Sequence, residues 1–127
     1  MPMIDGAIQD YALTLDKFLD HAAKWHPLTE VVTARADASI ARTGYAGLRE
    51  RAKRVTTLLH DLGVRKGGRV ATLSWNTQAH MECWYAVMGM GAVCHTLNPR
   101  LTSEQLAWMI GQSEAAILIV SSDLQPL

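Results

Sequence analysis

Three short apolar runs alternate with two helical stretches in the second half of the chain, and this alternation restricts the fold more than any other feature. The runs are RVATLS (69–74), AVCHTL (92–97) and AAILIV (115–120). The stretches between them are long enough to cross back over a sheet, so we expect parallel strands with right-handed connections. The last run is almost wholly apolar, which is typical of a strand buried on both faces. The second half therefore predicts a strand–helix–strand–helix–strand unit.

Both connecting helices have recognisable ends. The first is expected to begin at a side-chain cap, Asn76 or Thr77, and to end at the glycines at 89 and 91. Its apolar positions follow the helical period and are Met81, Trp84, Tyr85 and Met88. The second begins with the spacing of a capping box and a hydrophobic staple, formed by Thr102 with Gln105 and by Leu101 with Leu106. We expect this helix to run to about Gly111.

The first half is expected to hold two helices and a hairpin. Thr14 can cap a first helix that Pro27 stops, with apolar positions at Leu15, Phe18, Leu19 and Ala22. Residues 30–43 are interpreted as two short extended pieces that turn at Asp37–Ala38. A longer helix from Tyr45 to Leu62 then ends at a glycine, and its apolar stripe is Leu48, Ala52, Val55, Leu59 and Leu62.

The stretch GMGAVCHTLNPRL, residues 89–101, has three readings: a phosphate loop, a metal site, or a strand with its exit turn. A dinucleotide loop follows a strand and opens a helix, whereas these glycines end a helix and open a strand. Cys94 and His95 are adjacent on a strand and point to opposite faces, so they cannot easily share a metal. We therefore interpret the stretch as a strand and its exit turn. Cys94 is then a core residue, and His95 is either hydrogen-bonded or faces a cleft at the carboxyl end of the strand.

The charge balance argues against nucleic acid or an anionic membrane as a partner. The 127 residues include 12 Lys and Arg and 12 Asp and Glu, so the formal net charge is zero. Basic residues at 49–54 and 65–69 are interpreted as a solvated helix face and the turn after it. No apolar run has the length of a transmembrane segment, and the first residues lack the pattern of a signal peptide. With only Cys83 and Cys94, we expect a reduced, cytoplasmic protein.

The sequence contains no recognised catalytic motif. RKGG at 65–68 lacks the spacing of a Walker loop, there is no GxSxG elbow, and the serines have no triad context. The five histidines are scattered without metal-ligand spacing, and the stripe Met81, Trp84, Met88 is interpreted as core. We predict no catalytic, no cofactor-binding and no metal-binding residue in this chain.

Residues 43–110 resemble the N-terminal region of the AMP-forming acyl-CoA synthetases, the adenylate-forming superfamily. The T-x-Y-x-x-L spacing of Thr43, Tyr45 and Leu48 resembles the first core motif of that family, and GMGAVCHTLNPRL resembles its second. LTLDKFLDHAAKWHP at 13–27 is similar to the usual opening helix, and HTLNPRL at 95–101 is most like medium- and long-chain fatty-acyl-CoA ligases. The resemblance covers about residues 13–120.

The resemblance implies an α/β fold, as a partial N-terminal subdomain made of a short hairpin and a βαβαβ parallel sheet. Residues 1–13 would be a lead-in, and 14–127 a single but incomplete domain of a larger ligase. It also implies ATP, Mg²⁺ and CoA for the parent enzyme, with a phosphate loop expected beyond Leu127 and none of these cofactors bound by this chain. A scaffolding role is implied for the positions that match the motifs, which are Tyr45, Leu48, Gly91, Asn98 and Pro99.

Three functions follow as hypotheses. In the first, the chain is an inactive N-terminal fragment of a fatty-acyl-CoA ligase, whose partner is the remainder of the ligase chain, with a homodimer also open. In the second, it is a free-standing binding or assembly module that associates through the strand at 115–120. In the third, it is a small complete nucleotide-binding α/β protein.

Overall fold

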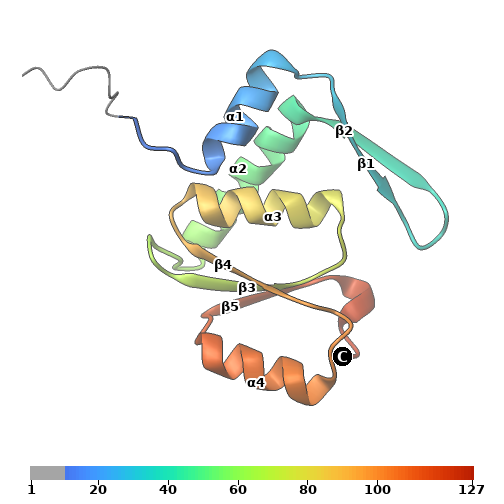
Figure 1. Cartoon of the computed structure of the whole chain (residues 1–127), viewed down its shortest axis with the longest axis vertical. Helices are drawn as coiled ribbons and strands as arrows, with labels where there is room; N and C mark the ends of the chain where they lie inside the picture. The colour runs from blue at the N-terminus through green and yellow to red at the C-terminus, as the bar shows by residue number, and fades with distance from the viewer. Residues whose placement is uncertain (1–10) are drawn as a thin grey trace, which may run out of the picture.

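The computed structural model describes residues 11–127 and contains a small parallel sheet, a hairpin and four α-helices (Figure 1). The first ten residues of the expected lead-in lie outside the described part. The helices are α1 (Asp16–Trp25), α2 (Tyr45–Asp61), α3 (Gln78–Gly89) and α4 (Ser103–Ser113). The strands are β1 (Glu30–Ala34), β2 (Ile40–Gly44), β3 (Arg69–Leu73), β4 (Val93–Leu97) and β5 (Ile117–Val120), and a 3₁₀ turn spans Ser122–Leu124.

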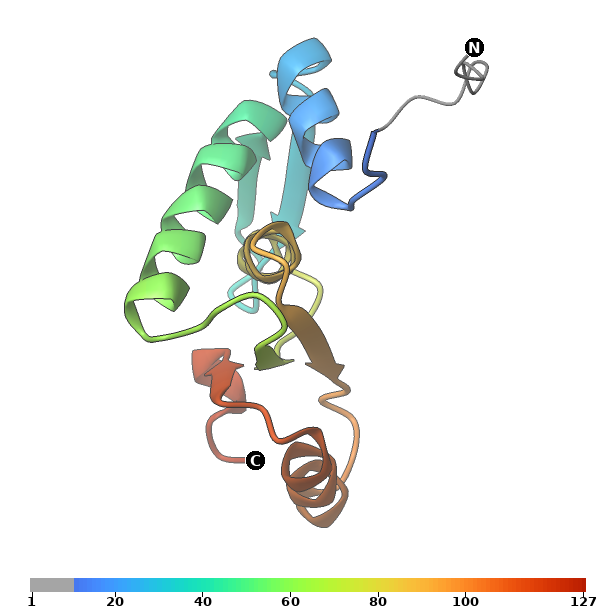
Figure 2. The ribbon, with the colours of Figure 1, turned by 90° about the vertical axis from the view of Figure 1, so that its left-hand side faces the viewer.

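The parallel sheet has the order β4-β3-β5, with β3 hydrogen-bonded to both neighbours. Figures 1 and 2 show α3 on one side of this sheet and α4 on the other. The chain steps from β3 to one neighbour through α3, and then back across β3 to the other neighbour through α4. Right-handed connections in opposite directions place their helices on opposite faces. The predicted βαβαβ unit is therefore confirmed.

Alternate residues of β3 belong to two separate cores. Val70 packs on the α3 side, in a cluster with Leu59, Val64, Ala86, Val87 and Ala92. Ala71 and Leu73 pack on the α4 side, with Leu97, Leu106 and Leu124. A third cluster, farther from the sheet, joins α1 and α2 through Leu19, Leu48 and Ala52. Because side chains of a strand alternate between its faces, one central strand holds both layers together.

The hairpin and the predicted ends of α2 and α4 are confirmed. β1 and β2 pair antiparallel, and the Asp37 carboxylate accepts from the Ser39 backbone N–H at 2.9 Å. Ala38 takes a left-handed conformation with φ of 64° without a glycine, beside this short Asx-type bond. α2 ends at Asp61 with Leu62 as its C-cap, and Gly63 follows with a φ of +95°. Thr102 and Gln105 form the complete capping box of α4.

The expected cap of α1 is wrong. Leu15 occupies the N-cap position, and no side-chain hydrogen bond caps this helix. Leu15 already has helical backbone angles, so Thr14 contributes only its carbonyl, which accepts from the Lys17 N–H at 3.1 Å. The predicted apolar face is also only partly used, because Leu19 is buried whereas Phe18 is 68% exposed.

The predicted apolar line of α3 is confirmed only in part. Met81 and Tyr85 are partly buried and pack against the α1–α2 cluster, but the fully buried residues of this helix are His80, Glu82, Ala86 and Val87. α3 lies between the sheet and the α1–α2 pair, so more than one of its faces is covered. Polar residues can be buried there because they find partners: Glu82 is 4% exposed and accepts from Arg51 Nε at 2.6 Å and from Gln78 Nε2 at 2.7 Å.

Two further apolar positions are less buried than expected. Leu62, at the end of the α2 stripe, is 60% exposed. The strand expected at 115–120 begins only at Ile117, and its Leu118 is 41% exposed. β5 has only one hydrogen-bonded neighbour in the described part of the chain, which explains why its burial is incomplete.

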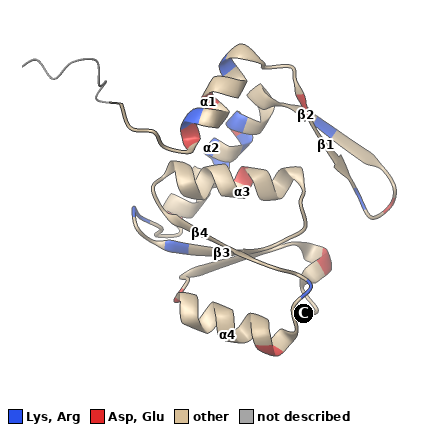
Figure 3. Cartoon of the chain, viewed as in Figure 1, with Lys and Arg blue, Asp and Glu red and all other residues tan. Residues whose placement is uncertain are grey.

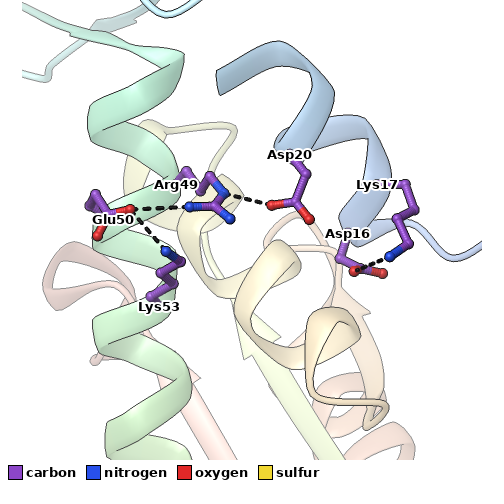
Figure 4. A network of polar contacts seen from close by, with 6 residues as sticks. All are labelled: Asp16, Lys17, Asp20, Arg49, Glu50 and Lys53. Carbon is purple, nitrogen blue, oxygen red and sulfur yellow. Dashed lines mark hydrogen bonds and ion pairs between the residues drawn. The ribbon is translucent and has the colours of Figure 1, made fainter. Parts of the chain in front are cut away.

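Three of the basic residues of α2, which are Arg49, Arg51 and Lys53, form ion pairs with carboxylates. Figure 3 shows basic segments on α2 and acidic segments on the neighbouring helices α1 and α3. Arg49 Nε donates to Asp20 Oδ1 at 2.6 Å, which joins α2 to α1 (Figure 4). Lys53 Nζ lies 3.0 Å from Glu50 Oε1 on the same helix. These pairs are largely exposed, so each contributes about 0–1 kcal/mol and serves mainly to neutralise charge.

Candidate functional site

A pocket of about 290 Å³ lies where β3 and β4 end. It is lined by Ser74, Trp75 and Asn76 after β3, by Thr96 to Arg100 at the end of β4 and beyond, and by His80 and Trp84 of α3. We call it the strand-end pocket. The chain leaves β3 toward α3 and leaves β4 toward α4, on opposite faces of the sheet (Figure 2). Open α/β sheets bind ligands at such a switch point.

The lining combines two indole rings with one guanidinium group. The guanidinium carbon of Arg100 lies 6.0 Å from the centre of the Trp75 ring. None of the lining residues is Asp or Glu, and Arg100 forms no ion pair with any carboxylate in residues 11–127. A positive charge without a counter-charge beside flat rings suits an anionic ligand that also carries a planar group.

The loop that carries Arg100 is held by its own hydrogen bonds. Asn98 Oδ1 accepts from the Arg100 backbone N–H at 3.0 Å, and the Asn98 carbonyl accepts from the Leu101 N–H at 3.1 Å. The capping box of α4 follows directly. Short turns of this kind fix the backbone that carries the Arg100 side chain. The interpretation of residues 89–101 as a strand with its exit turn is confirmed.

His80 forms the inner wall of the pocket and is only 5% exposed. Its Nε2 lies 2.8 Å from Thr72 Oγ1 and 2.9 Å from Trp84 Nε1. Its Nδ1 is buried and makes no hydrogen bond of ordinary geometry within the described residues. Burial lowers the pKa of His80, and the nearby backbone carbonyl of Trp75 partly opposes that change.

His95, which was expected either to be hydrogen-bonded or to face a cleft, does not line this pocket. Its Nε2 is buried and has no hydrogen-bond partner among residues 11–127. Cys94 packs against the α3-side cluster, as predicted, and burial raises the pKa of its thiol. Burial also raises the pKa of Cys83 to about 11, so both thiols stay protonated at neutral pH.

Gly91, near the start of residues 89–101, is required by the local backbone conformation and by the space around it. Gly91 has a φ of +76°, and a side chain there would lie 3.1 Å from Lys66 Cγ. Within residues 11–127, no three His, Cys, Asp or Glu side chains are grouped so as to hold a metal ion. Of the motif positions, Leu48 is fully buried and Tyr45 packs against the same cluster.

Trp75, His80, Trp84 and Arg100 were not singled out as site residues from the sequence. One signal was available: His80 and Trp84 are four residues apart on a helix that directly follows a parallel strand. That spacing puts both side chains on one helical face, near the carboxyl end of the sheet.

No helix of the described residues has both the length and the apolar character needed to span a membrane.

Comparison with known proteins gives consistent matches. The family model described as AMP-binding enzyme matches residues 19–126. A 3-methylmercaptopropionyl-CoA ligase of Ruegeria lacuscaerulensis is 36% identical over 96% of this chain and 23% of its own length. A long-chain-fatty-acid–CoA ligase of Thermus thermophilus is 39% identical over 100% of this chain and 24% of its own length. The chain thus spans about a quarter of the length of these relatives.

Solved structures agree with the fold. A fatty acyl CoA synthetase of Mycobacterium tuberculosis superposes with a TM-score of 0.79 at 25% identity, over 89% of this chain and 22% of that one. The expected α/β fold, of the kind found in the N-terminal domains of adenylate-forming enzymes, is therefore confirmed.

Proposed function

This chain belongs to the AMP-binding enzyme family, and on that premise we propose that it forms the N-terminal part of an AMP-forming acyl-CoA ligase. Such an enzyme joins a carboxylate to ATP, releasing pyrophosphate, and then exchanges AMP for the thiol of CoA. The continuous family match over residues 19–126 is the observation that carries this proposal. Relatives with substrates as different as long-chain fatty acids and 3-methylmercaptopropionate leave the acyl group open.

The role proposed for residues 14–127 is to build one end of the ligase domain and to supply the strand-end pocket. The second part of this role replaces the expectation that the chain binds no cofactor. Arg100 would neutralise a phosphate, and Trp75 and Trp84 would stack on a ring, because each lines the same small space. Among the reactants of the proposed reaction, the adenine nucleotide portions of ATP and CoA combine both properties. Mg²⁺ would be held by other parts of the ligase, because no carboxylate lines this pocket.

The 127-residue chain is expected to make no acyl-adenylate by itself. A chimera in which it replaces the matching quarter of the Thermus thermophilus ligase is expected to make acyl-CoA, because the match covers the whole chain at 39% identity. Both proteins would be assayed for fatty-acid-dependent exchange of labelled pyrophosphate into ATP, with the unaltered Thermus ligase as reference. A folded chimera without exchange, or exchange by the chain alone, would contradict the proposal.

Replacing Arg100 with Gln is expected to weaken binding of an adenine nucleotide to the strand-end pocket by roughly tenfold or more, since it removes a hydrogen bond to a charged group. The measurement is isothermal titration calorimetry of the chain with ATP and, separately, with CoA. Arg54→Gln is the matched control, because Arg54 is exposed and lies on α2, outside the pocket lining. Equal affinities of the two variants for the nucleotide would show that Arg100 does not take part in binding it.

Two of the hypotheses differ in the exposed apolar surface that becomes covered. Trp108 is 67% exposed and lines a groove with Leu101 and Met109. We propose that the remainder of the ligase chain covers it, since the relatives are about four times as long. The alternative is the free-standing binding module, which would associate through the strand at 115–120 instead. The module requires a dimer, seen by light scattering, that Leu118→Lys dissociates. The fragment requires that Trp108 becomes buried in the chimera, measured by the quenching of its fluorescence.

A further inference from the structure

The contact between His80 and Trp84 assigns the proton on the imidazole. An indole N–H can only donate, and Trp84 Nε1 lies 2.9 Å from His80 Nε2. Nε2 must therefore carry a lone pair, and the neutral ring must carry its proton on Nδ1. The Thr72 hydroxyl, 2.8 Å from the same nitrogen, can also donate to it. The two rings meet edge to face, with their centres 5.0 Å apart.

This arrangement joins the pocket wall to the sheet. Thr72 belongs to the central strand β3 and is 1% exposed. His80 thus connects a fixed point of the sheet with the indole that lines the strand-end pocket. Trp84 has no other hydrogen bond from its indole in the described part of the chain. Its orientation therefore depends on the acceptor that His80 supplies.

We propose that His80 is a positioning residue that fixes the Trp84 wall of the strand-end pocket through its neutral imidazole, and that protonating His80 releases this wall. Once Nε2 is protonated, it becomes a donor that lies opposite the N–H donor of the Trp84 indole. The hydrogen bond between the two rings is then replaced by repulsion. The consequence for ligand binding rests on the proposed function of the pocket. The release of Trp84 itself does not, because it needs no ligand.

Burial, rather than the charged groups nearby, has the largest effect on the pKa of His80. Three such groups are near His80. Arg100 lines the same pocket, Cys94 lies on β4 beside the strand that carries Thr72, and Glu82 on the same helix is paired with Arg51 of α2. None of them shifts the pKa of His80, which burial lowers from 6.5. The neutral ring therefore stabilises the folded chain fully above pH 6.5. That stability is lost as the pH falls from there through the lower pKa of the folded state.

Trp84 is expected to lose hydrogen-exchange protection of its indole N–H, by about tenfold, as His80 becomes protonated. The measurement is the ¹H–¹⁵N spectrum of the ¹⁵N-labelled chain between pH 8 and 5, with the Trp84 signal assigned from Trp84→Phe. The exposed indole of Trp108 gives the intrinsic exchange rate in the same sample. The midpoint should lie below 6.5 and coincide with the titration of the His80 ring itself.

Two substitutions separate positioning from a general effect of pH. His80→Gln keeps an acceptor that cannot ionise, so Trp84 should stay protected throughout, whereas the exposed His60→Gln should behave as the wild type. Persistence of the transition in His80→Gln, or its absence in the wild type, would overturn the proposal. Should His80→Gln not fold, the coincidence of the two wild-type midpoints still decides. Release of Trp84 without any binding of ATP or CoA would uphold this positioning role and count against the proposed ligand of the pocket.

Discussion

Replacing Leu48 with Ala is expected to destabilise the chain by about 3 kcal/mol, since large-to-small changes at fully buried leucines cost roughly 2–5 kcal/mol. Leu48 has 0% of its surface exposed and lies at the centre of the cluster that joins α1 and α2. The cavity left behind is bordered by partly buried side chains of two other elements, Val31 of β1 and Met81 and Tyr85 of α3, which cannot all move in to fill it. Urea unfolding followed by circular dichroism gives the free energy of unfolding.

Leu58→Ala is the matched control, because it removes the same atoms from the same helix at a position that is 57% exposed. Its expected cost is below about 0.5 kcal/mol. Similar losses for both variants would mean that the α1–α2 cluster does not form as described. A large loss at Leu48 alone would support a scaffolding role for the Thr43, Tyr45, Leu48 spacing.

Replacing Gly44 with Ala is expected to cost roughly 2 kcal/mol, within the usual range for forcing a methyl group into filled space. Gly44 ends β2 and precedes α2, and its φ of −74° suits any residue. The obstacle is contact: a Cβ there would lie 2.5 Å from the Pro27 carbonyl oxygen, which also accepts from the Ala46 N–H at 3.2 Å. The α1–β1 loop would have to move, and that hydrogen bond would weaken. Thermal unfolding with calorimetry measures the effect.

Gly111→Ala in α4 provides the opposite case. A Cβ at Gly111 meets nothing within 4 Å, so the substitution adds helix propensity without a clash. It is expected to stabilise the chain by about 0.5–1 kcal/mol. If Gly44→Ala were as stable as the wild type, the close approach of the α1–β1 loop to α2 would be wrong.

The strand-end pocket was not predicted from the sequence, which was expected to hold no cofactor-binding residue. The rule that ligands lie at the carboxyl ends of parallel strands applied only to one of the two alternatives for His95, the one in which His95 faces a cleft. The histidine in the pocket is instead His80, which reaches it from α3. The rotation of α3 about its axis decides which of its side chains reach the pocket. The apolar period did not predict this rotation, because polar residues on the buried faces of α3 have hydrogen-bond partners.

The sequence alone was sufficient for the order of elements, the capping box of α4 and the parallel connections. Each of these depends on neighbouring residues: the 3.6-residue and two-residue periods, cap spacing, and the length of a crossover. Only the tertiary structure decided that β3 is the central strand, that α3 buries His80 and Glu82, and that Arg100 lines one pocket with two indoles and no carboxylate. These outcomes depend on pairs such as Thr72 with His80 and Arg51 with Glu82, which are brought together by packing between elements. The free energy of burying a polar side chain is set by the partner it meets, and spacing along the chain does not reveal that partner.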